Sequence, residues 1–375
     1  MSNYSTLQEH RAMVFDDQRN DLYAKAIKKA VSKDSVVLDL GAGLGLHGFI
    51  AAQAGAKRVY LVEPSAIIEV TRQLINANKM STQIECISGG IEEVKLAEKA
   101  DLIISVFTGN FLLTEDLLPS LFHARDRYLK PGGKLIPDRA VMTVVPVTAT
   151  TSYEKHVTAW NKSSQGMAFD LARGFAANQL YSEASGQNQI EFLSEPADLL
   201  EIDFMTATES SCHSRVDVEI TRDGLCHGWL GWFRMRLGDH WLSTSPEDKK
   251  THWRQLFLPL AEPVRVKKNS VIHFELDRPE FGEWTWSTEY DGRKQRQSTF
   301  LAQPTTPAAL QRKSDSHKPR ISLKGTAANE VISRFKGNQS TAEIVDYIAT
   351  KYDMLFPNRK LADNFVKNLV DQHCL

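Results

Sequence analysis

The stretch that decides the fold runs Val36-Val37-Leu38-Asp39-Leu40-Gly41-Ala42-Gly43-Leu44-Gly45. Its apolar first half is typical of a buried strand, and its glycines indicate a tight turn before a helix. A second apolar strand ends in an acid, Glu63, twenty residues after Gly43. Glycine lets the backbone approach a ligand closely, and a carboxylate can accept hydrogen bonds from both hydroxyls of a ribose. This order predicts a nucleoside-binding βαβ unit.

The spacing of the glycines separates two classes of ligand. A dinucleotide fingerprint has glycines at its first, third and sixth positions. Here they stand at 41, 43 and 45, and position 46 is Leu. No Gly-Lys-Ser/Thr follows, so a triphosphate-binding loop is not expected either. A nucleoside without a pyrophosphate fits this turn better, and S-adenosylmethionine is the commonest cofactor of that kind.

The composition is that of an ordinary globular protein. The 375 residues are 42% hydrophobic and 24% charged, with a formal net charge of -1, so two or three domains are expected. The charge balance argues against nonspecific nucleic-acid binding, and no apolar run is long enough for a membrane helix. Without a signal-peptide pattern, and with four scattered cysteines, we expect a cytoplasmic protein with no metal site.

The first 140 residues alternate strands with helices. The predicted strands are 35–40, 58–63, 84–88, 101–105 and 134–137, and the predicted helices are 19–31, 46–54, 65–78 and 115–129. Such alternation implies a parallel, Rossmann-like sheet covered on both faces. Ligands bind beyond the carboxyl ends of such strands, so the residues that directly follow them should line one crevice: Gly41, Glu63, Ile91 and Val106.

After residue 140 the pattern changes to strands separated by turns. The predicted strands are 141–147, 198–206, 214–221, 227–237 and 268–276, which suggests an antiparallel β domain over 141–302. An irregular, partly helical insert at 166–195 interrupts them. Residues 303–320 have the composition of a linker, and 321–375 form a small helical module. In that module Ser340-Thr341-Ala342-Glu343 is a capping box that opens a helix through about Lys351, and a second helix covers 361–370.

Residues 4 to about 300 carry a series of short motifs in a fixed order. They include Val37-Leu38-Asp39-Leu40-Gly41, Ala51-Ala52-Gln53-Ala54-Gly55-Ala56, Ala77-Asn78-Lys79, Ile91-Glu92-Glu93-Val94, Lys130-Pro131-Gly132-Gly133 and Ile136-Pro137-Asp138-Arg139-Ala140. The most specific is Thr251-His252-Trp253-Arg254-Gln255. In this order the motifs resemble the protein arginine methyltransferases. The resemblance implies a domain that binds S-adenosylmethionine, joined to a β-barrel that carries a helical dimerisation arm at 166–195, and hence a homodimer.

The resemblance also implies which residues bind the cofactor. Gly41, Gly43 and Gly45 would pass under its methionyl part, next to Asp39 of the same set, and Glu63 would hold its ribose. Three further cofactor residues lie elsewhere in the chain: Arg19, Ile91 and Glu92. Arg19 would pair with the cofactor carboxylate, for which a planar guanidinium is well suited. Ile91 and Glu92 would flank the adenine.

A second set of residues belongs to the chemistry and to the acceptor. Asp16 and His252 would pair, which fixes the imidazole and closes the N-terminal helix against the barrel. His10 and Met13 match the family at the segment before Asp16. The resemblance further places these residues near the acceptor: Tyr4, Val106, Phe107 and Trp253. We count Glu115, His252 and Asp16 as catalytic, and we assign no residue to a metal.

The sequence departs from the family where the acceptor binds. The family holds a guanidinium with two glutamates on one hairpin, which here runs from Ser105 to Glu115. Glu115 matches the second glutamate, whereas Val106 stands at the position of the first. A buried arginine beside a valine would be poorly compensated, at a cost of several kcal/mol. We therefore expect an acceptor with less charge: an amide or imidazole nitrogen, a hydroxyl, a thiol or a modified side chain.

The last 55 or so residues resemble a different family. The run from Ser333 to Ile344, with Phe335-Lys336-Gly337 and then the capped helix, is similar to the PqqD-like peptide-recognition domains, and Phe365 to Val370 matches their last helix. The resemblance implies a winged-helix-like module that grips the leader of a peptide by adding it as a strand beside a helix groove. The alternative is a helical appendage that stabilises a dimer.

Three functions remain open at this point. The first is an S-adenosylmethionine-dependent methyltransferase that modifies a side chain of a peptide or protein, plausibly a ribosomally made precursor held by the C-terminal module. The second is a cofactor-binding partner with little or no activity that activates another enzyme, as the loss of an acid at Val106 suggests. The third is a small-metabolite methyltransferase in which the module only dimerises.

Overall fold

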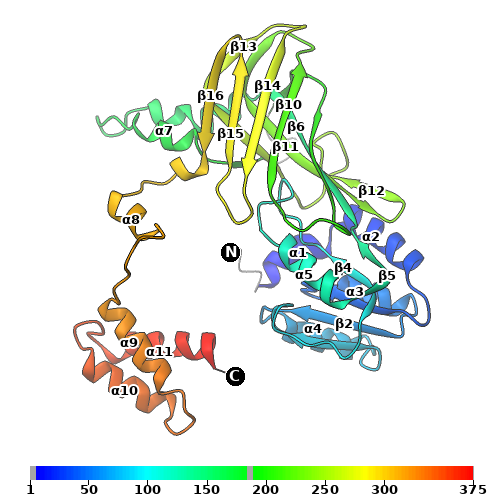
Figure 1. Ribbon diagram of the computed structural model, residues 1–375, viewed down its shortest axis with the longest axis vertical. Coiled ribbons are helices and arrows are strands. Elements are labelled where there is room, and N and C mark those ends of the chain that lie inside the picture. The colour runs from blue at the N-terminus through cyan, green and yellow to red at the C-terminus, as the bar shows by residue number, and fades with distance from the viewer. Residues whose placement is uncertain (1–5, 184–188, 375) are drawn as a thin grey trace. The chain divides into compact units, whose positions relative to one another are not determined.

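The computed structural model describes residues 6–183 and 189–374. The chain divides into two compact units, Met1–Pro304 and Thr305–Leu375. The first unit contains a parallel sheet with helices followed by an antiparallel β structure, and the second is helical (Figure 1). The predicted fold class of the first unit is confirmed.

A five-stranded parallel sheet in the order β3-β2-β1-β4-β5 forms the first half of unit 1. Its strands are β1 (Val36–Leu40), β2 (Arg58–Glu63), β3 (Ile84–Ser88), β4 (Ala100–Ser105) and β5 (Leu129–Ile136). The helices between them are α3 (Leu46–Gln53), α4 (Ile68–Ala77) and α5 (Leu118–Tyr128). Every residue of β1 is buried, as expected for a central strand covered on both faces. The sheet order turns at β1 and β4, so a crevice opens beyond their carboxyl ends.

Two helices precede the sheet. α1 (Leu7–Val14) begins with a capping box between Thr6 and Glu9. The N-cap of α2 (Asp17–Ala30) is Asp16, whose side chain accepts a hydrogen bond from the backbone N–H of Arg19. α2 buries Tyr23 completely. The N-terminal helices are therefore fixed against the sheet through α2.

Antiparallel strands make up the second half of unit 1. They form a seven-stranded sheet (β7-β13-β11-β6-β8, with β9 on β6 and β12 on β11) and a four-stranded sheet (β10-β14-β15-β16). Their bounds are β6 (Arg139–Thr148), β7 (Tyr181–Glu183), β8 (Glu191–Phe192), β9 (Ala197–Asp203), β10 (Cys212–Glu219), β11 (Gly224–Leu237), β12 (His240–Ser243), β13 (Gln255–Val266), β14 (Val271–Arg278), β15 (Thr285–Tyr290) and β16 (Arg293–Ser298). Trp229, Phe274 and Trp286 are fully buried between the sheets. This is the predicted barrel-like domain.

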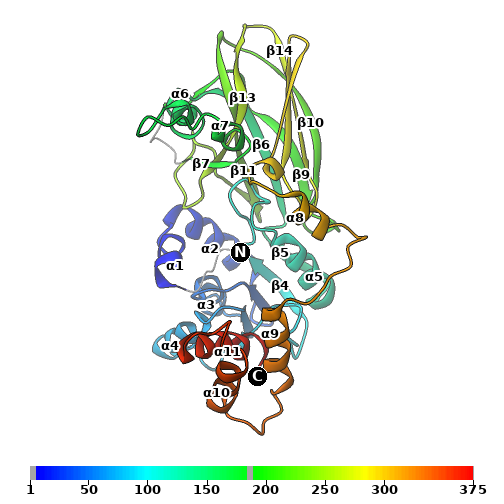
Figure 2. The same ribbon diagram turned by 90° about the vertical axis from the view of Figure 1, so that its left-hand side faces the viewer.

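The insert that interrupts the strands projects from one edge of the barrel (Figure 2). It contains α6 (Thr150–His156), the short 3₁₀-helix η1 (Thr158–Asn161) and α7 (Ala172–Ala176). The insert thus begins earlier than the predicted 166–195, and its strand β7 pairs with β13. Its outer part exposes large apolar side chains: Trp160, Met167, Phe169, Leu171 and Phe175.

Several predicted boundaries were wrong. β5 begins at Leu129, so the Lys130–Gly133 turn lies inside the strand rather than before it, at a register shift against β4. α5 begins at Leu118 because residues 106–117 form a loop after β4. The linker prediction missed the short helix α8 (Pro307–Arg312), which Thr306 caps.

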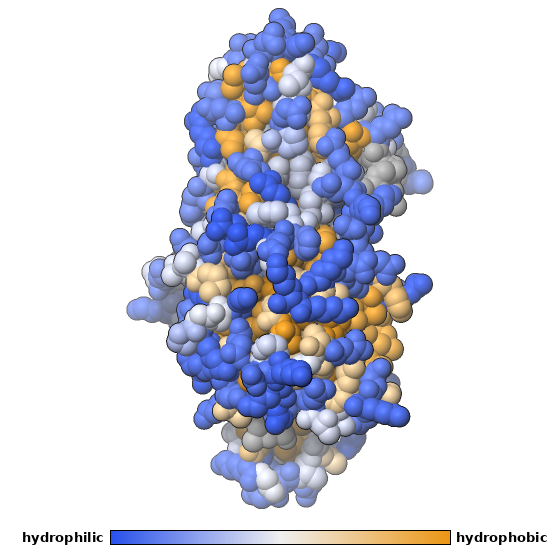
Figure 3. Space-filling view, turned by 90° about the vertical axis from the view of Figure 1, so that its right-hand side faces the viewer, coloured by the Kyte–Doolittle hydropathy of each residue, from blue (hydrophilic) through white to orange (hydrophobic). Residues whose placement is uncertain are grey.

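Figure 3 shows the face with β12 and α2, which is mostly hydrophilic with apolar side chains near its middle.

Unit 2 is a three-helix module with its own core. α9 (Leu323–Ser333), α10 (Thr341–Lys351) and α11 (Arg359–His373) bury Ala327, Val331, Ile344, Val345, Ile348, Ala362 and Val366. The predicted capping box at Ser340 is confirmed. Over the described residues 305–374 there is no strand, so the predicted winged-helix form, which requires a β wing, is not found there.

Candidate functional site

A pocket of about 370 Å³ lies beyond the carboxyl ends of β1, β2 and β4. The N-terminal helices and the loop before β13 complete its wall. The predicted residues that line it are Arg19, Gly41, Gly43, Glu63, Val106, Phe107, Glu115, His252 and Trp253. Residues distant in sequence thus meet at the predicted crevice.

The side-chain rings of Phe107 and His10 pack against the glycine turn. Gly41 and Gly43 have φ values of +66° and +52°, which L side chains rarely adopt. A Cβ at Gly41 would stand 2.3 Å from Cε1 of Phe107, and one at Gly43 would stand 2.8 Å from Cε1 of His10. Both rings contact the turn only because these positions have no side chain. The turn is therefore a cradle that any other residue would fill.

Glu63 lies at the pocket with its carboxylate fixed on both sides. Oε2 accepts a hydrogen bond from the backbone N–H of Gly43 at 2.9 Å, and Oε1 accepts one from Ser65 at 2.9 Å. A carboxylate offers about four lone-pair sites, so two vicinal hydroxyls can still be accepted. The backbone bonds orient the acid for that task.

Two predicted cofactor residues lie beneath the pocket wall. Asp39 is buried, and its Oδ2 accepts a hydrogen bond at 2.8 Å from the backbone N–H of Gly48 in α3. Burial raises the pKa of the Asp39 carboxyl to about 7, and the bond from Gly48 opposes this only in part. A Cβ at Gly45 would meet Thr71 and Leu61. Asp39 and Gly45 therefore hold the glycine turn and α3 in place.

The predicted adenine residues are not part of this wall. Ile91 is buried in the turn after β3, and Oε1 of Glu92 accepts a hydrogen bond from Ser120 at 2.6 Å. Neither lines the pocket. Their contact with an adenine stays a prediction. Tyr4 lies outside the described residues, so its predicted role near the acceptor is also untested.

Arg19 brings a buried cation to the pocket. It is 3% exposed; its Nη2 donates to the carbonyl of Met13 at 2.7 Å and its Nε to Oδ1 of Asn20 at 3.0 Å. Its guanidinium carbon lies 5.8 Å from the ring centre of Trp253. These bonds use two of five N–H donors, so the others can meet an anionic group. A carboxylate suits this position best.

Asp16 and His252 pair as predicted. Oδ2 of Asp16 lies 2.8 Å from Nδ1 of His252 and accepts the backbone N–H of the same residue at 2.8 Å. Burial works to raise the pKa of Asp16, but the hydrogen bonds from His252 and Arg19 outweigh it and the pKa is lowered. Burial lowers the pKa of His252 more than Asp16 raises it. The imidazole is therefore neutral at pH 7 and donates from Nδ1.

The hairpin 105–115 is held from both halves of unit 1. The hydroxyl of Tyr23 donates to the carbonyl of Ser105 at 2.8 Å. From the barrel side, Nε1 of Trp253 donates to the carbonyl of Thr108 at 2.7 Å. These bonds fix the segment 105–108, which places Val106 in the pocket wall.

The hairpin end of the pocket, where the resemblance implied the acceptor, has one carboxylate of the expected pair in its wall. Among the described residues that line the pocket, the acids are Glu63 at the glycine turn and Glu115 at the hairpin. Val106 occupies the other predicted position. At the hairpin the pocket wall thus holds one carboxylate, Glu115, and one valine.

Sequence reasoning missed several residues of the wall. They include Val14, His47, Asn110 and Leu117. His47 directly follows the glycine turn, and this position was the only available signal.

Over the described residues 6–183 and 189–374, no group of His, Cys, Asp and Glu could hold a metal ion. Within the same residues, no helix has the length and hydropathy needed to cross a bilayer.

Two family models match unit 1. One described as "Methyltransferase domain" matches residues 37–133, and one described as "Arginine methyltransferase oligomerization subdomain" matches residues 138–283. Their border falls where β6 begins. The two models together cover the glycine turn, the hairpin and the barrel strands from β6 to β14.

Curated relatives and solved structures agree with these models. The chain is 32% identical over 291 residues to protein arginine N-methyltransferase 6 of Danio rerio, covering 73% of this chain and 82% of that one. It is 31% identical over 307 residues to a probable protein arginine N-methyltransferase 6.1 of Oryza sativa, covering 72% and 80%. The Trypanosoma brucei PRMT1 enzyme-prozyme complex with AdoHcy has a TM-score of 0.71 at 27% identity, covering 79% and 99%. For Arabidopsis thaliana protein arginine methyltransferase 10 the TM-score is 0.67 at 26% identity, covering 79% and 99%.

The Asp16–His252 pair predicts how stability depends on pH. The fold lowers the pKa of His252 below the usual value of about 6.5. The neutral imidazole therefore makes its full contribution to the free energy of unfolding above about pH 6.5, and this contribution is lost as the pH falls through the lower pKa of the folded state. In His252→Asn the amide can still donate to Asp16 but does not titrate. Between pH 7 and pH 5, the free energy of unfolding should fall less in this variant than in the wild type, by about 1 kcal/mol.

Urea unfolding at the two pH values measures this difference. His213→Asn, in which an exposed strand residue is replaced, is the matched control and should follow the wild type. An equal fall in His252→Asn and the wild type would contradict the assignment.

Proposed function

Because the chain belongs to the protein arginine N-methyltransferase family, we propose that it methylates a side chain of a peptide or protein other than ordinary arginine. The family is S-adenosylmethionine-dependent, so this chain is a methyltransferase with that cofactor. The observation that carries the choice of acceptor is that Val106 lines the pocket together with Glu115, at the position where the family has its other glutamate.

The residues of the pocket fit S-adenosylmethionine. The turn at Gly41 and Gly43 is a cradle that a Cβ would fill, Glu63 has acceptors for a ribose, and buried Arg19 has donors for a carboxylate. When bound, the cofactor supplies a methyl group activated by a positive sulfur. Asp16 and His252 keep this side of the pocket closed, which excludes water from the reacting atoms.

The acceptor must suit a site with one carboxylate. A guanidinium would lose its hydration at Val106 without gaining a second negative partner, which costs several kcal/mol. A neutral nitrogen, hydroxyl or thiol avoids this cost and needs one group to orient it. Glu115 can accept a hydrogen bond from such an acceptor, which directs its lone pair, and can take the proton that it releases.

Positioning supplies the rest of the rate. The transfer requires the acceptor's lone pair about 3 Å from the methyl group and in line with the leaving sulfur. The hairpin that carries Val106 and Glu115 is fixed through Tyr23 and Trp253, so the acceptor end holds a constant geometry relative to Gly41. Phe107 packs on the same turn and joins the two ends.

Val106→Glu tests the choice of acceptor. Restoring the second carboxylate should increase methylation of a synthetic arginine–glycine peptide at least about tenfold, because the buried cation is then compensated. Mass spectrometry of the peptide with S-adenosylmethionine measures the methyl increment. Val106→Leu is the control and should give no increase. Wild-type transfer to this peptide at the rate of the Val106→Glu variant would overturn the proposal.

We further propose that unit 2 holds the peptide substrate. Its three helices have their own core and, over residues 321–375, carry seven Lys or Arg against six Asp or Glu, while residues 305–320 before them carry four against one. A hollow of about 320 Å³ lies between its helices, lined by Lys324, Leu355, Phe356, Leu361, Phe365 and Asn368. Nζ of Lys324 lies 5.8 Å from the ring centre of Phe365. An apolar side chain flanked by acidic residues fits this hollow.

The helical form of the module changes how a peptide would bind. In the described residues 305–374 there is no strand edge to extend, so the peptide would lie in the groove between helices rather than add a strand. Holding the peptide there raises its effective concentration at the pocket. That is the advantage of a tethered module for a pocket with weak attraction for its acceptor.

Leu361→Asp tests the groove. Leu361 is 45% exposed, so the change should leave the core intact while placing a like charge against an acidic peptide. Fluorescence anisotropy of a labelled dodecapeptide with one Phe between Asp and Glu residues should show at least about tenfold weaker binding than to the wild type. Leu310→Asp on α8, 41% exposed, is the matched control. Equal binding of a peptide with Lys at the flanking positions would contradict the charge argument.

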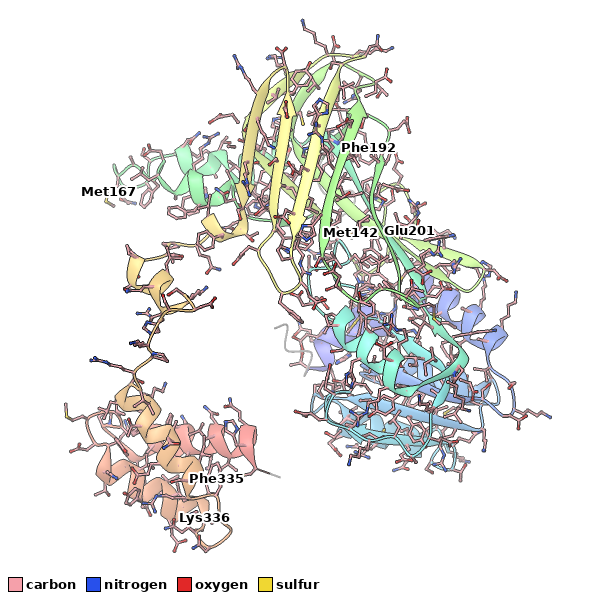
Figure 4. The ribbon with its side chains drawn as sticks, in the orientation of Figure 1. Met142, Met167, Phe192, Glu201, Phe335 and Lys336 are labelled. Carbon is pink, nitrogen blue, oxygen red and sulfur yellow. The ribbon has the colours of Figure 1, made fainter. Side chains whose placement is uncertain are left out.

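We also propose a homodimer formed through the insert. Leu171 is 87% exposed and Met167 58%, and Met167 lies at the outer tip of the insert (Figure 4). An apolar surface of this kind on a soluble unit is typical of an interface. The family model over the barrel is described by its role in oligomerization.

Leu171→Asp should separate the two subunits. A charge in an apolar interface without a partner costs several kcal/mol, so the variant should sediment as a monomer at micromolar concentration while the wild type sediments as a dimer. Val271→Asp on β14, 45% exposed, is the control and should stay dimeric. A monomeric wild type would contradict the proposal.

A second function is favoured by the same valine. A chain that binds the cofactor but lacks one acid of the pair can serve as an inactive partner, and the solved Trypanosoma brucei complex joins an enzyme with a prozyme. This function predicts normal cofactor binding by the isolated chain and no transfer to any peptide, with activity only after a second methyltransferase is added.

A further inference from the structure

His47 is a buried histidine in the pocket wall that the known chemistry of the site does not use. It is the second residue of α3 and follows the glycine turn. It is 5% exposed and lines the pocket together with Arg19. Its ring stacks on Tyr23, with 4.4 Å between the centroids and 21° between the planes. The stacking fixes the plane of the imidazole.

The imidazole is not satisfied by the protein around it. Nε2 of His47 is buried, and among the residues that the structure describes no group hydrogen-bonds to it. A buried polar atom without a partner is destabilising, and a leucine would fill similar space without that cost. Because His47 lines the pocket, the unpartnered Nε2 points to a partner on the ligand.

The charge state of His47 limits what that partner can be. Burial lowers the pKa of the imidazole well below its usual value, and the positive charge of Arg19 lowers it further. The ring is therefore neutral at pH 7, with one N–H donor and one acceptor nitrogen. The influence of Arg19 also indicates that both side chains serve the same end of the pocket.

We propose that His47 helps bind the amino-acid end of the cofactor, with a ring N–H donating to the carboxylate that pairs with Arg19. A carboxylate has about four lone-pair sites, so it can accept a guanidinium and an imidazole at once. The Tyr23 stack holds the ring, and the start of α3 carries it to the pocket. This role concerns the cofactor alone and is independent of which acceptor is methylated.

The test combines one substitution with two ligands. Titration calorimetry with S-adenosylhomocysteine should show about tenfold weaker binding to His47→Leu than to the wild type, as expected for a hydrogen bond to a charged group. The analogue that lacks only the carboxylate should bind both proteins alike. His47→Gln keeps an N–H donor and should recover part of the affinity. His213→Leu, on the exposed face of β10, is the matched control and should bind like the wild type.

Other outcomes would overturn the assignment. Equal weakening of both ligands would show that His47 only supports the fold of the turn, and unchanged affinity for S-adenosylhomocysteine would show that it makes no contact. If the analogue without the carboxylate is affected but one without the amino group is not, the partner is the ammonium. Because no methyl transfer is measured, these results are separate from a failure of the proposed acceptor.

Discussion

The carboxylate of Asp16 is the contact on which the closed side of the pocket depends. It accepts hydrogen bonds from the backbone N–H of Arg19 and from both the backbone and the ring of His252. The first bond starts α2 at the right residue, which puts the guanidinium on the pocket wall. The others fix the loop before β13, so that Trp253 reaches the hairpin at Thr108. One buried side chain thus joins the N-terminal helices, the barrel and the acceptor hairpin.

The barrel is part of the site for the same reason. Phe111 of the hairpin packs into the barrel domain, where its ring stacks on Trp284 with 5.8 Å between ring centres. Gly231 in β11 makes this possible, since a Cβ there would stand 2.6 Å from the phenyl ring. Phe111 itself has a φ of +54°, a costly conformation for an aromatic residue. The packing that holds it there also fixes Val106 and Glu115, so the acceptor end is defined by both halves of unit 1.

How much could be predicted depended on whether a signal was local. The parallel sheet and its glycine turn were predicted because apolar runs and glycines mark them directly. β13 was missed because Pro259 argues against a central strand; the pairing of β13 with β11 shifts register between Pro259 and Val264. β16, Arg293–Ser298, is polar and is ordered by pairing with β15 and by hydrogen bonds between Gln295 and the backbone of Glu262 in β13. The Asp16–His252 contact spans 236 residues and was accessible only through family resemblance. His47 belongs to no motif; its place after the glycine turn was a weak signal, and its burial and unpartnered Nε2 single it out in the structure.

The replacement of one acid by Val106 separates two tasks that a pair of glutamates combines. Paired carboxylates both attract the substrate and direct its lone pair, whereas Glu115 alone can direct a lone pair but attracts a cation weakly. Affinity for the substrate must then come from contacts away from the reacting atoms. Such contacts can hold the acceptor in place without stabilising its ground state at the pocket. A helical module joined to the chain through the basic segment 305–322 is suited to that task. The cofactor contacts proposed for Arg19 and Glu63 do not involve the hairpin, so under the proposed function a change at a single hairpin position would alter specificity while the methyl donor stays the same.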